Sequence, residues 1–164
     1  MKIYIFRHGQ TIESKYNLAY SRERKLTAEI LPETIPVIEK LGKFLSQVKT
    51  DANFTSPVKR CLQTVEIIKK VSGKEFEVDE NIKEWMDPEE SFESLVQRVS
   101  RFYEKISSSN YNSVALCSHG AILAGIKSFF ENQNFPIQNL HDYPSPGVLI
   151  VLDSKTKNIE QINF

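Results

Sequence analysis

The sequence predicts an α/β protein, a three-layer α/β/α sandwich with a mostly parallel central sheet. Two observations favour this class. Short apolar segments of strand type alternate along the chain with amphipathic segments of helical period. A strand, a helix and a further strand form a right-handed crossover unit in which both strands run parallel. The first apolar segment, Ile3–Phe6, is also continuous rather than alternating, which is typical of a strand covered on both faces.

Five segments have the length and composition of strands. They are Ile3–Phe6, Ala52–Ser56, Phe76–Val78, Ser113–Ser118 and Val148–Leu152. We expect the last of them to be the final strand of the sheet. The residues from Gly9 to about Lys25 are polar and of mixed charge, which predicts a loop after the first strand.

Four regions between the strands place apolar residues three or four positions apart, the period of an amphipathic helix. The first opens at Leu26–Thr27 and becomes regular from about Pro36, because two prolines disturb its first turns. Two others are Phe92–Ile106 and Ala121–Phe130.

The fourth helical region follows the second strand. Ser56 is expected to cap it and Pro57 to be its first residue, since proline is tolerated where a helix begins. It should end before Ser72-Gly73, a typical stop signal.

Length and composition indicate one ordinary globular domain, residues 1–164. Lys plus Arg and Asp plus Glu both number 21, so no net charge favours nucleic acid or a membrane surface. No apolar run approaches the ~20 residues that span a bilayer, and the cytoplasm is the expected location. Cys61 and Cys117 have no metal-ligand spacing and are expected to be free thiols. His141 lies in a polar segment and is expected at the surface.

Three strand-to-helix junctions carry cationic or imidazole side chains. Arg7 and His8 follow the first strand, Arg60 follows the second, and His119 follows Ser113–Ser118. Because ligands bind beyond the carboxyl ends of strands in an open parallel sheet, these four side chains should meet. Guanidinium groups and imidazoles near helix N-termini suit the oxygens of a transferring phosphoryl group. The sequence therefore predicts a phosphate site.

The same junctions carry a family resemblance. The strings RHGQT (Arg7–Thr11), SPVKRCLQT (Ser56–Thr64) and SHGA (Ser118–Ala121) resemble the signatures of the histidine phosphatase superfamily, the phosphoglycerate-mutase-like proteins. EESFESLVQRV (Glu89–Val99) resembles a segment of its small phosphatases. The similarity extends over nearly the whole chain.

The resemblance implies a role for each matching residue. His8 matches the nucleophile that becomes phosphohistidine. Arg7, Arg60 and His119 match the residues that hold the phosphoryl group. Glu84 matches the acid that protonates the leaving oxygen, a step an alkoxide requires. The implied enzyme is a phosphatase that needs no metal or other cofactor and acts on a phosphorylated small molecule or a phosphoprotein.

Two assignments stay open at this level. The family often has an asparagine six residues after the nucleophile, where this chain has Ser14 and Asn17 lies three residues further on, so Asn17 and Ser14 are the two candidates for that substrate contact. Asp87, Glu89 and Glu90 lie close to Glu84 and are alternative proton donors.

Three other functions are compatible with parts of the pattern. His8, His119 and a carboxylate could bind zinc, although Arg7 and Arg60 would repel it. A non-catalytic phosphate-binding module would keep the arginines but not need the nucleophile or the acid. A cofactor-dependent mutase carries long insertions that enclose a bisphosphate, whereas Trp85–Glu90 is short. The oligomeric state is not predicted.

Overall fold

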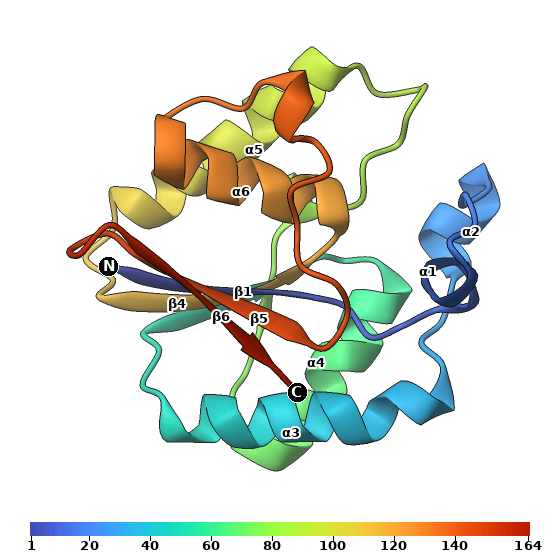
Figure 1. Cartoon of the computed structure of the whole chain (residues 1–164), viewed down its shortest axis with the longest axis horizontal. Coiled ribbons are helices and arrows are strands. Elements are labelled where there is room, and N and C mark those ends of the chain that lie inside the picture. Colours follow the sequence, from blue (N-terminus) through green and yellow to red (C-terminus); the bar gives the residue numbers. More distant parts are fainter.

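A six-stranded sheet forms the centre of the computed structural model, which describes all residues from Met1 to Phe164 (Figure 1). The strands lie in the order β3-β2-β4-β1-β5-β6. In chain order they are β1 Lys2–Arg7, β2 Ala52–Thr55, β3 Glu77–Val78, β4 Ser113–Ser118, β5 Val148–Asp153 and β6 Asn158–Asn163. β1, β4, β2 and β3 pair in parallel, whereas β5 is antiparallel to both β1 and β6. The mostly parallel sheet expected from the sequence is confirmed.

The prediction that Val148–Leu152 is the final strand is wrong, because β6 follows and pairs with β5 along its whole length. Ile159 and Ile162 are the only aliphatic residues of β6, and they stand three positions apart. That spacing is neither a continuous apolar run nor the alternation of a half-buried strand. β6 forms at the edge of the sheet because a short turn after β5 brings it alongside.

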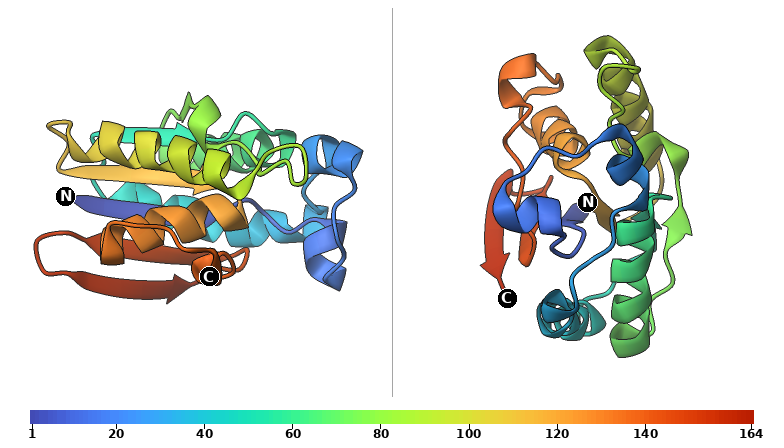
Figure 2. Two further views of the ribbon diagram at one scale, coloured as in Figure 1. Left: turned by 90° about the horizontal axis from the view of Figure 1, so that it is seen from above. Right: turned by 90° about the vertical axis from the view of Figure 1, so that its right-hand side faces the viewer.

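Four long helices cover the sheet, two on each face (Figure 1 and Figure 2). α3 (Ile35–Gln47) and α4 (Lys59–Ser72) pack on one face, and α5 (Phe92–Ser107) and α6 (Gly120–Asn132) on the other. α4 ends at Ser72, one residue later than expected, and its C-cap Gly73 has the left-handed φ of 73° that is typical of a helix stop. The three-layer sandwich is confirmed.

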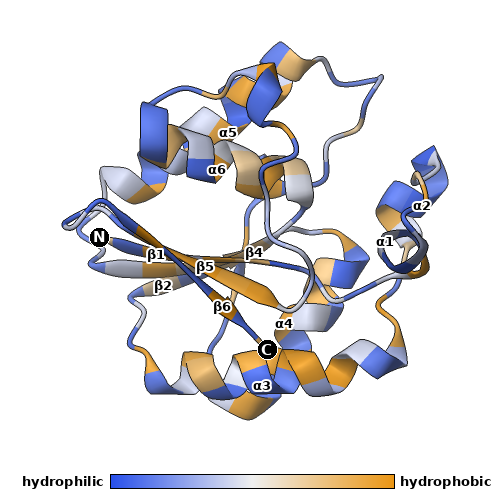
Figure 3. Ribbon diagram, in the orientation of Figure 1, coloured by the Kyte–Doolittle hydropathy of each residue, from blue (hydrophilic) through white to orange (hydrophobic).

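The core has two clusters, one beneath each pair of helices, because successive strand residues point to opposite faces. Leu116 packs in the cluster under α5 and α6, and its neighbour Cys117 in the cluster under α3 and α4. Figure 3 shows hydrophobic residues in the central strands and at intervals along the helices. Cys61 and Cys117 are free and buried, as expected.

The segment expected to be a loop contains two short helices, α1 (Ile12–Tyr16) and α2 (Arg22–Thr27). Each has a hydroxyl cap: Thr11 accepts from the amide of Ser14, and Ser21 from that of Arg24. Leu26-Thr27 ends α2 instead of opening the next helix, which begins at Ile35 after the 3-10 turn η1 (Pro32–Thr34). The short 3-10 turns η2 (Glu80–Ile82) and η3 (Ile137–Asn139) complete the elements. None of the helices combines the length and apolar character that a membrane crossing requires.

Candidate active site

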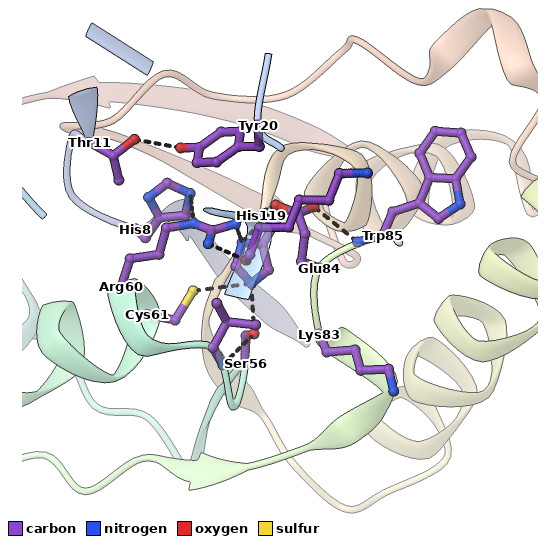
Figure 4. A network of polar contacts seen from close by, with 12 residues as sticks. His8, Thr11, Tyr20, Ser56, Arg60, Cys61, Lys83, Glu84, Trp85 and His119 are labelled. Atoms are coloured by element: carbon purple, nitrogen blue, oxygen red, sulfur yellow. Dashed lines mark hydrogen bonds and ion pairs between the residues drawn. The ribbon is translucent and has the colours of Figure 1, made fainter. Parts of the chain in front are cut away.

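The ends of β1 and β4 bring two histidines side by side. Arg7 pairs with Ser118 in these adjacent parallel strands, so the next residues, His8 and His119, leave the sheet at the same edge. Their ring centroids are 5.3 Å apart. Arg60 reaches them from α4 and Glu84 from the segment after η2 (Figure 4).

His8 is fully buried and held as a neutral imidazole. Its Nδ1 lies 2.8 Å from the carbonyl oxygen of Gly9, which can only accept, so Nδ1 carries the hydrogen. Nε2 keeps its lone pair and accepts a hydrogen bond from Nε of Arg60 at 3.0 Å. Burial lowers the pKa of His8 well below its usual value, and the charges of Arg60 and Arg7 lower it further. Neutral imidazole is the form in which histidine acts as a nucleophile.

The guanidinium of Arg60 lies at the centre of the site and is fully buried. Its Nη2 contacts Oε2 of Glu84 at 2.5 Å and Nδ1 of His119 at 2.9 Å. Its Nη1 donates to the carbonyl oxygen of Lys25 at 2.6 Å. The central guanidinium carbon, Cζ, lies 4.9 Å from the ring centroid of Tyr20. One arginine thus connects nucleophile, second histidine and acid.

The orientation of His119 depends on Ser56. Because Nδ1 of His119 accepts from Arg60, Nε2 carries the hydrogen and donates to Oγ of Ser56 at 2.7 Å. Burial lowers the pKa of His119 well below its usual value, as do the neighbouring Arg60 and His8. The prediction that Ser56 caps a helix starting at Pro57 is wrong, since α4 begins at Lys59. The Ser56 hydroxyl instead fixes His119 so that Nδ1 faces the other site residues.

Glu84 is the acid that the structure brings to this cluster. Its Oε2 lies 3.3 Å from Nδ1 of His119, in addition to its contact with Arg60. Its Oε1 accepts from the amide of Trp85 at 2.9 Å, which fixes the carboxylate. The side chain is 15% exposed, so it borders both the cluster and solvent.

The three alternative acids are placed differently. Asp87 and Glu89 are exposed, and Glu89 forms an ion pair with Arg22 at 2.9 Å. Glu90 accepts two hydrogen bonds from Arg98, at 2.5 and 2.9 Å. The pKa of Glu90 lies below its usual value. Burial alone would raise this pKa, but the hydrogen bonds and charge of Arg98 outweigh burial. None of the three contacts His8, Arg60 or His119.

Arg7 borders a pocket of about 380 Å³. Its Nε is buried without a hydrogen-bond partner, and its guanidinium lies 5.1 Å from the ring centroid of Tyr143. The pocket lining also includes Tyr20, Lys25, Glu84, Trp85 and His141. A Cβ at Gly120 would lie 2.7 Å from the Tyr143 ring, so this position requires glycine. A buried donor without a partner, next to the other cations, fits an anion.

The comparison with known proteins decides the family. A sequence model described as the histidine phosphatase superfamily (branch 1) matches residues 3–87, about half of the chain. The chain belongs to the histidine phosphatase superfamily. The matched segment contains Arg7, His8, Arg60 and Glu84.

The relatives of this superfamily member have different names. A Hydrogenobacter thermophilus protein named "Putative phosphoserine phosphatase 2" is 24% identical over 157 residues, 76% of each chain. The alpha-ribazole phosphatase from Shigella flexneri is 17% identical with a TM-score of 0.80, covering 100% of this chain and 96% of that one. A phosphoglycerate mutase from Bacillus anthracis is 15% identical with a TM-score of 0.71, covering 100% and 92%. At these identities the solved structures show the shared fold alone.

Asn17, which the sequence predicts as a substrate contact, does not lie with the other predicted site residues. It is the C-cap of α1, in the left-handed conformation at φ 52° and ψ 45°, and it is exposed. Ser14 accepts from the amide of Thr11 at 2.8 Å in the capping box of the same helix. α1 thus ends at Asn17, outside the residues that line the pocket.

Three contacts of the histidine phosphatase site were not nominated from the sequence: Ser56, Tyr20 and Tyr143. Ser56 lies in the same string, SPVKR, as Arg60, and this is the one feature of the sequence that could have indicated a place in the site. Tyr20 bonds Thr11 through its hydroxyl at 2.5 Å, and Tyr143 packs on Gly120. Both tyrosines come from polar segments without a pattern. His141 is exposed, as expected, although it also lines the pocket.

Arg98 on α5 holds the segment that carries Glu84. Its side chain is only 6% exposed, and it donates to the carbonyls of Asn81 at 2.8 Å, Lys83 at 2.9 Å and Glu84 at 3.3 Å. The ion pair with Glu90 fixes the guanidinium from the other side. A planar fork of donors suits this arrangement. Arg98 therefore determines where the Glu84 backbone lies.

Proposed function

We propose that this histidine phosphatase hydrolyses phosphomonoesters through a phosphohistidine at Nε2 of His8, without a metal or other cofactor. One observation carries the proposal: the lone pair of a buried neutral imidazole lies among Arg60, His119 and Glu84 and beside an arginine donor without a partner. The substrate would be a phosphorylated small molecule or a phosphoprotein. The phosphatase-named relative from Hydrogenobacter supports this class of reaction.

In the first step a phosphoryl dianion would replace the Glu84 carboxylate on Arg60. Arg7 and Arg60 would hold the phosphoryl oxygens, and these contacts strengthen as negative charge shifts in the transition state. His119 would join them only after Nδ1, which carries a lone pair in the neutral site, takes up a proton beside the dianion and becomes a donor. Nε2 of His8 attacks phosphorus while the bond from phosphorus to the leaving oxygen breaks. Glu84, protonated beside the dianion, gives its proton to that oxygen.

In the second step water replaces the alcohol. Glu84, now a carboxylate, takes a proton from the water as its oxygen attacks phosphorus. The bond from phosphorus to Nε2 breaks and phosphate leaves. The Gly9 carbonyl keeps the hydrogen of His8 on Nδ1 throughout, so Nε2 is free to accept the phosphoryl group. Because the pKa of His8 is low, the imidazole stays neutral in mildly acidic solution.

The short connection between Glu84 and α5 favours a phosphatase over a mutase. The acid-bearing segment reaches α5 through Trp85–Ser91 alone, which leaves little chain to cover a bound bisphosphate. Water can reach Glu84 because its side chain is partly exposed. Hydrolysis of the phosphohistidine is therefore the expected second step.

The function is tested by hydrolysis of p-nitrophenyl phosphate in excess chelator. We expect turnover to persist and vanadate to inhibit competitively, because it takes the shape of the transferring phosphoryl group. Loss of activity that zinc restores would favour a metal hydrolase. Binding of phosphate without any turnover would reduce the protein to a phosphate-binding module.

The Arg98→Lys variant tests how Glu84 is positioned. Lysine keeps the charge but not the fork of donors, so the segment should shift. A displacement of about 1 Å can cost about 10²-fold in rate. We expect that loss in kcat for an alkyl phosphate and a much smaller loss for p-nitrophenyl phosphate, whose leaving group needs no acid. Stopped or continuous rate assays on both substrates give the ratio.

The matched control is Lys105→Met. Lys105 lies on the same helix and bonds Asp79 at 2.9 Å, at the other end of the segment from Glu84. The Lys105→Met substitution should lower stability without changing the ratio of the rates for the alkyl phosphate and p-nitrophenyl phosphate. Equal losses on both substrates in Arg98→Lys would mean that Arg98 supports the fold and not the position of the acid.

A further inference from the structure

A second hollow lies beside Glu84. It has a volume of about 590 Å³, larger than the pocket at Arg7. Its apolar lining consists of Leu26, Pro57, Val58, Leu62 and Met86. Leu26 comes from α2, Pro57, Val58 and Leu62 come from α4 and the connection before it, and Met86 comes from the segment after Glu84. The hollow is thus built from three parts of the chain that meet at the catalytic edge of the sheet.

Glu84 lines both hollows. In the proposed reaction its carboxyl group protonates the leaving oxygen, so the rest of the alcohol must extend from a point beside Glu84. Two paths are then open, one along the pocket at Arg7 and one into the second hollow. The first is bordered by charged side chains, including Lys25 and Asp87. The second also has charged side chains in its lining, Lys59, Glu80, Lys83 and Glu84, but most of its exposed wall is apolar.

The apolar walls of the second hollow have no protein partner to cover them. Leu26 is 51% exposed and Leu62 is 40% exposed. Burial of such surface against an apolar ligand is favourable in proportion to the area removed from water. Met86, with an unbranched and polarizable side chain, can adjust to ligands of different shape.

The charged residues at the rim are already paired. Lys59 forms an ion pair with Glu29, and Lys83 lies 3.9 Å from Glu80. No unpaired cation therefore attracts a second anionic group of the substrate into this hollow. An uncharged hydrocarbon group is the occupant that suits it.

We infer that this hollow binds the alcohol part of the substrate, and that the preferred substrate is a small phosphomonoester whose alcohol carries an apolar chain or ring. This inference rests on the proposed phosphatase function. It selects against phosphomonoesters of compact, charged alcohols such as phosphoserine.

The experiment measures kcat/KM for ethyl, butyl, hexyl and octyl phosphate and for phosphoserine. Each buried methylene should raise kcat/KM about fourfold until the hollow is filled. Leu62→Gln keeps helix propensity and length but places an amide on the wall, so it should flatten this rise. Ile137→Gln is the matched control, since Ile137 is 48% exposed and lies outside both hollows. It should leave the rise unchanged.

The outcomes separate the inference from the proposed function. Turnover of p-nitrophenyl phosphate with no dependence on chain length, or a preference for phosphoserine, would overturn the inference alone. So would an equal rise in wild type and in both Leu62→Gln and Met86→Gln, because the chain would then bind elsewhere. Absence of turnover with every phosphomonoester would overturn the function and the inference together.

Discussion

The His8→Ala substitution is expected to lower kcat by about 10⁴-fold or more, which is the scale of loss when a catalytic nucleophile is deleted. Nothing else in the site offers a lone pair in the same place, because the ring of His119, the other histidine of the cluster, is centred 5.3 Å away. Arg60 would lose the acceptor of its Nε, and a buried donor without a partner costs about 1–3 kcal/mol of stability. The variant should therefore fold with a lower melting temperature.

The decisive measurement is the covalent intermediate. Wild-type protein quenched in base during turnover of labelled substrate should carry phosphate that is stable in base and released by later acid treatment. Mass spectrometry of the base-quenched protein should locate it at His8. His141→Ala is the matched control, an exposed histidine of the same pocket, and should still acquire the label. Label on a serine, or label retained in His8→Ala, would remove His8 from the mechanism.

The meeting of His8, Arg60 and His119 could be predicted because it follows from the sheet. Strands β1, β2 and β4 are adjacent and parallel, so residues just beyond their carboxyl ends reach one edge whatever the details of the loops. β1 and β4 contain continuous apolar runs, Ile3–Phe6 and Val114–Cys117, whereas β2 has only Ala52 and Phe54. The order and direction of these strands therefore predict that the three side chains meet at one edge of the sheet.

The parts that could not be predicted depend on tertiary contacts. β6 has almost no strand pattern and exists because β5 offers it an edge. Ser56 has the local signature of a helix cap, yet its hydroxyl binds His119, a residue 63 positions away. The expectation for Asn17 rests only on the family resemblance, and in the structure Asn17 ends α1 and does not line the pocket. Local sequence could not distinguish these outcomes.

The Glu84→Gln variant is expected to show the second large effect, and the effect depends on the substrate. Glutamine keeps the shape and can still accept from the Trp85 amide, but it cannot give up a proton. For an alkyl phosphate the leaving oxygen needs that proton, so the rate of phosphorylation should fall by about 10²–10⁴-fold. For p-nitrophenyl phosphate the phenolate leaves without help, and this step should change far less.

The second step gives Glu84→Gln a distinct kinetic signature. Water attack on the phosphohistidine also uses Glu84, as a base, so the variant should stall after one turnover. Rapid mixing with p-nitrophenyl phosphate should therefore give a burst of nitrophenol close to one equivalent per site, followed by a slow steady rate. The stalled protein should carry the phosphate on His8.

Glu90→Gln tests whether the acid has been assigned correctly. Glu90 is bound to Arg98 and does not contact His8, Arg60 or His119, so its loss should slow the alkyl phosphate by displacing Glu84 and should give no burst. Equal losses on both substrates in Glu84→Gln, again without a burst, would show that Glu84 neither protonates the leaving oxygen nor activates water. The ion pair of Glu84 with Arg60 would then serve only to hold the arginine in place.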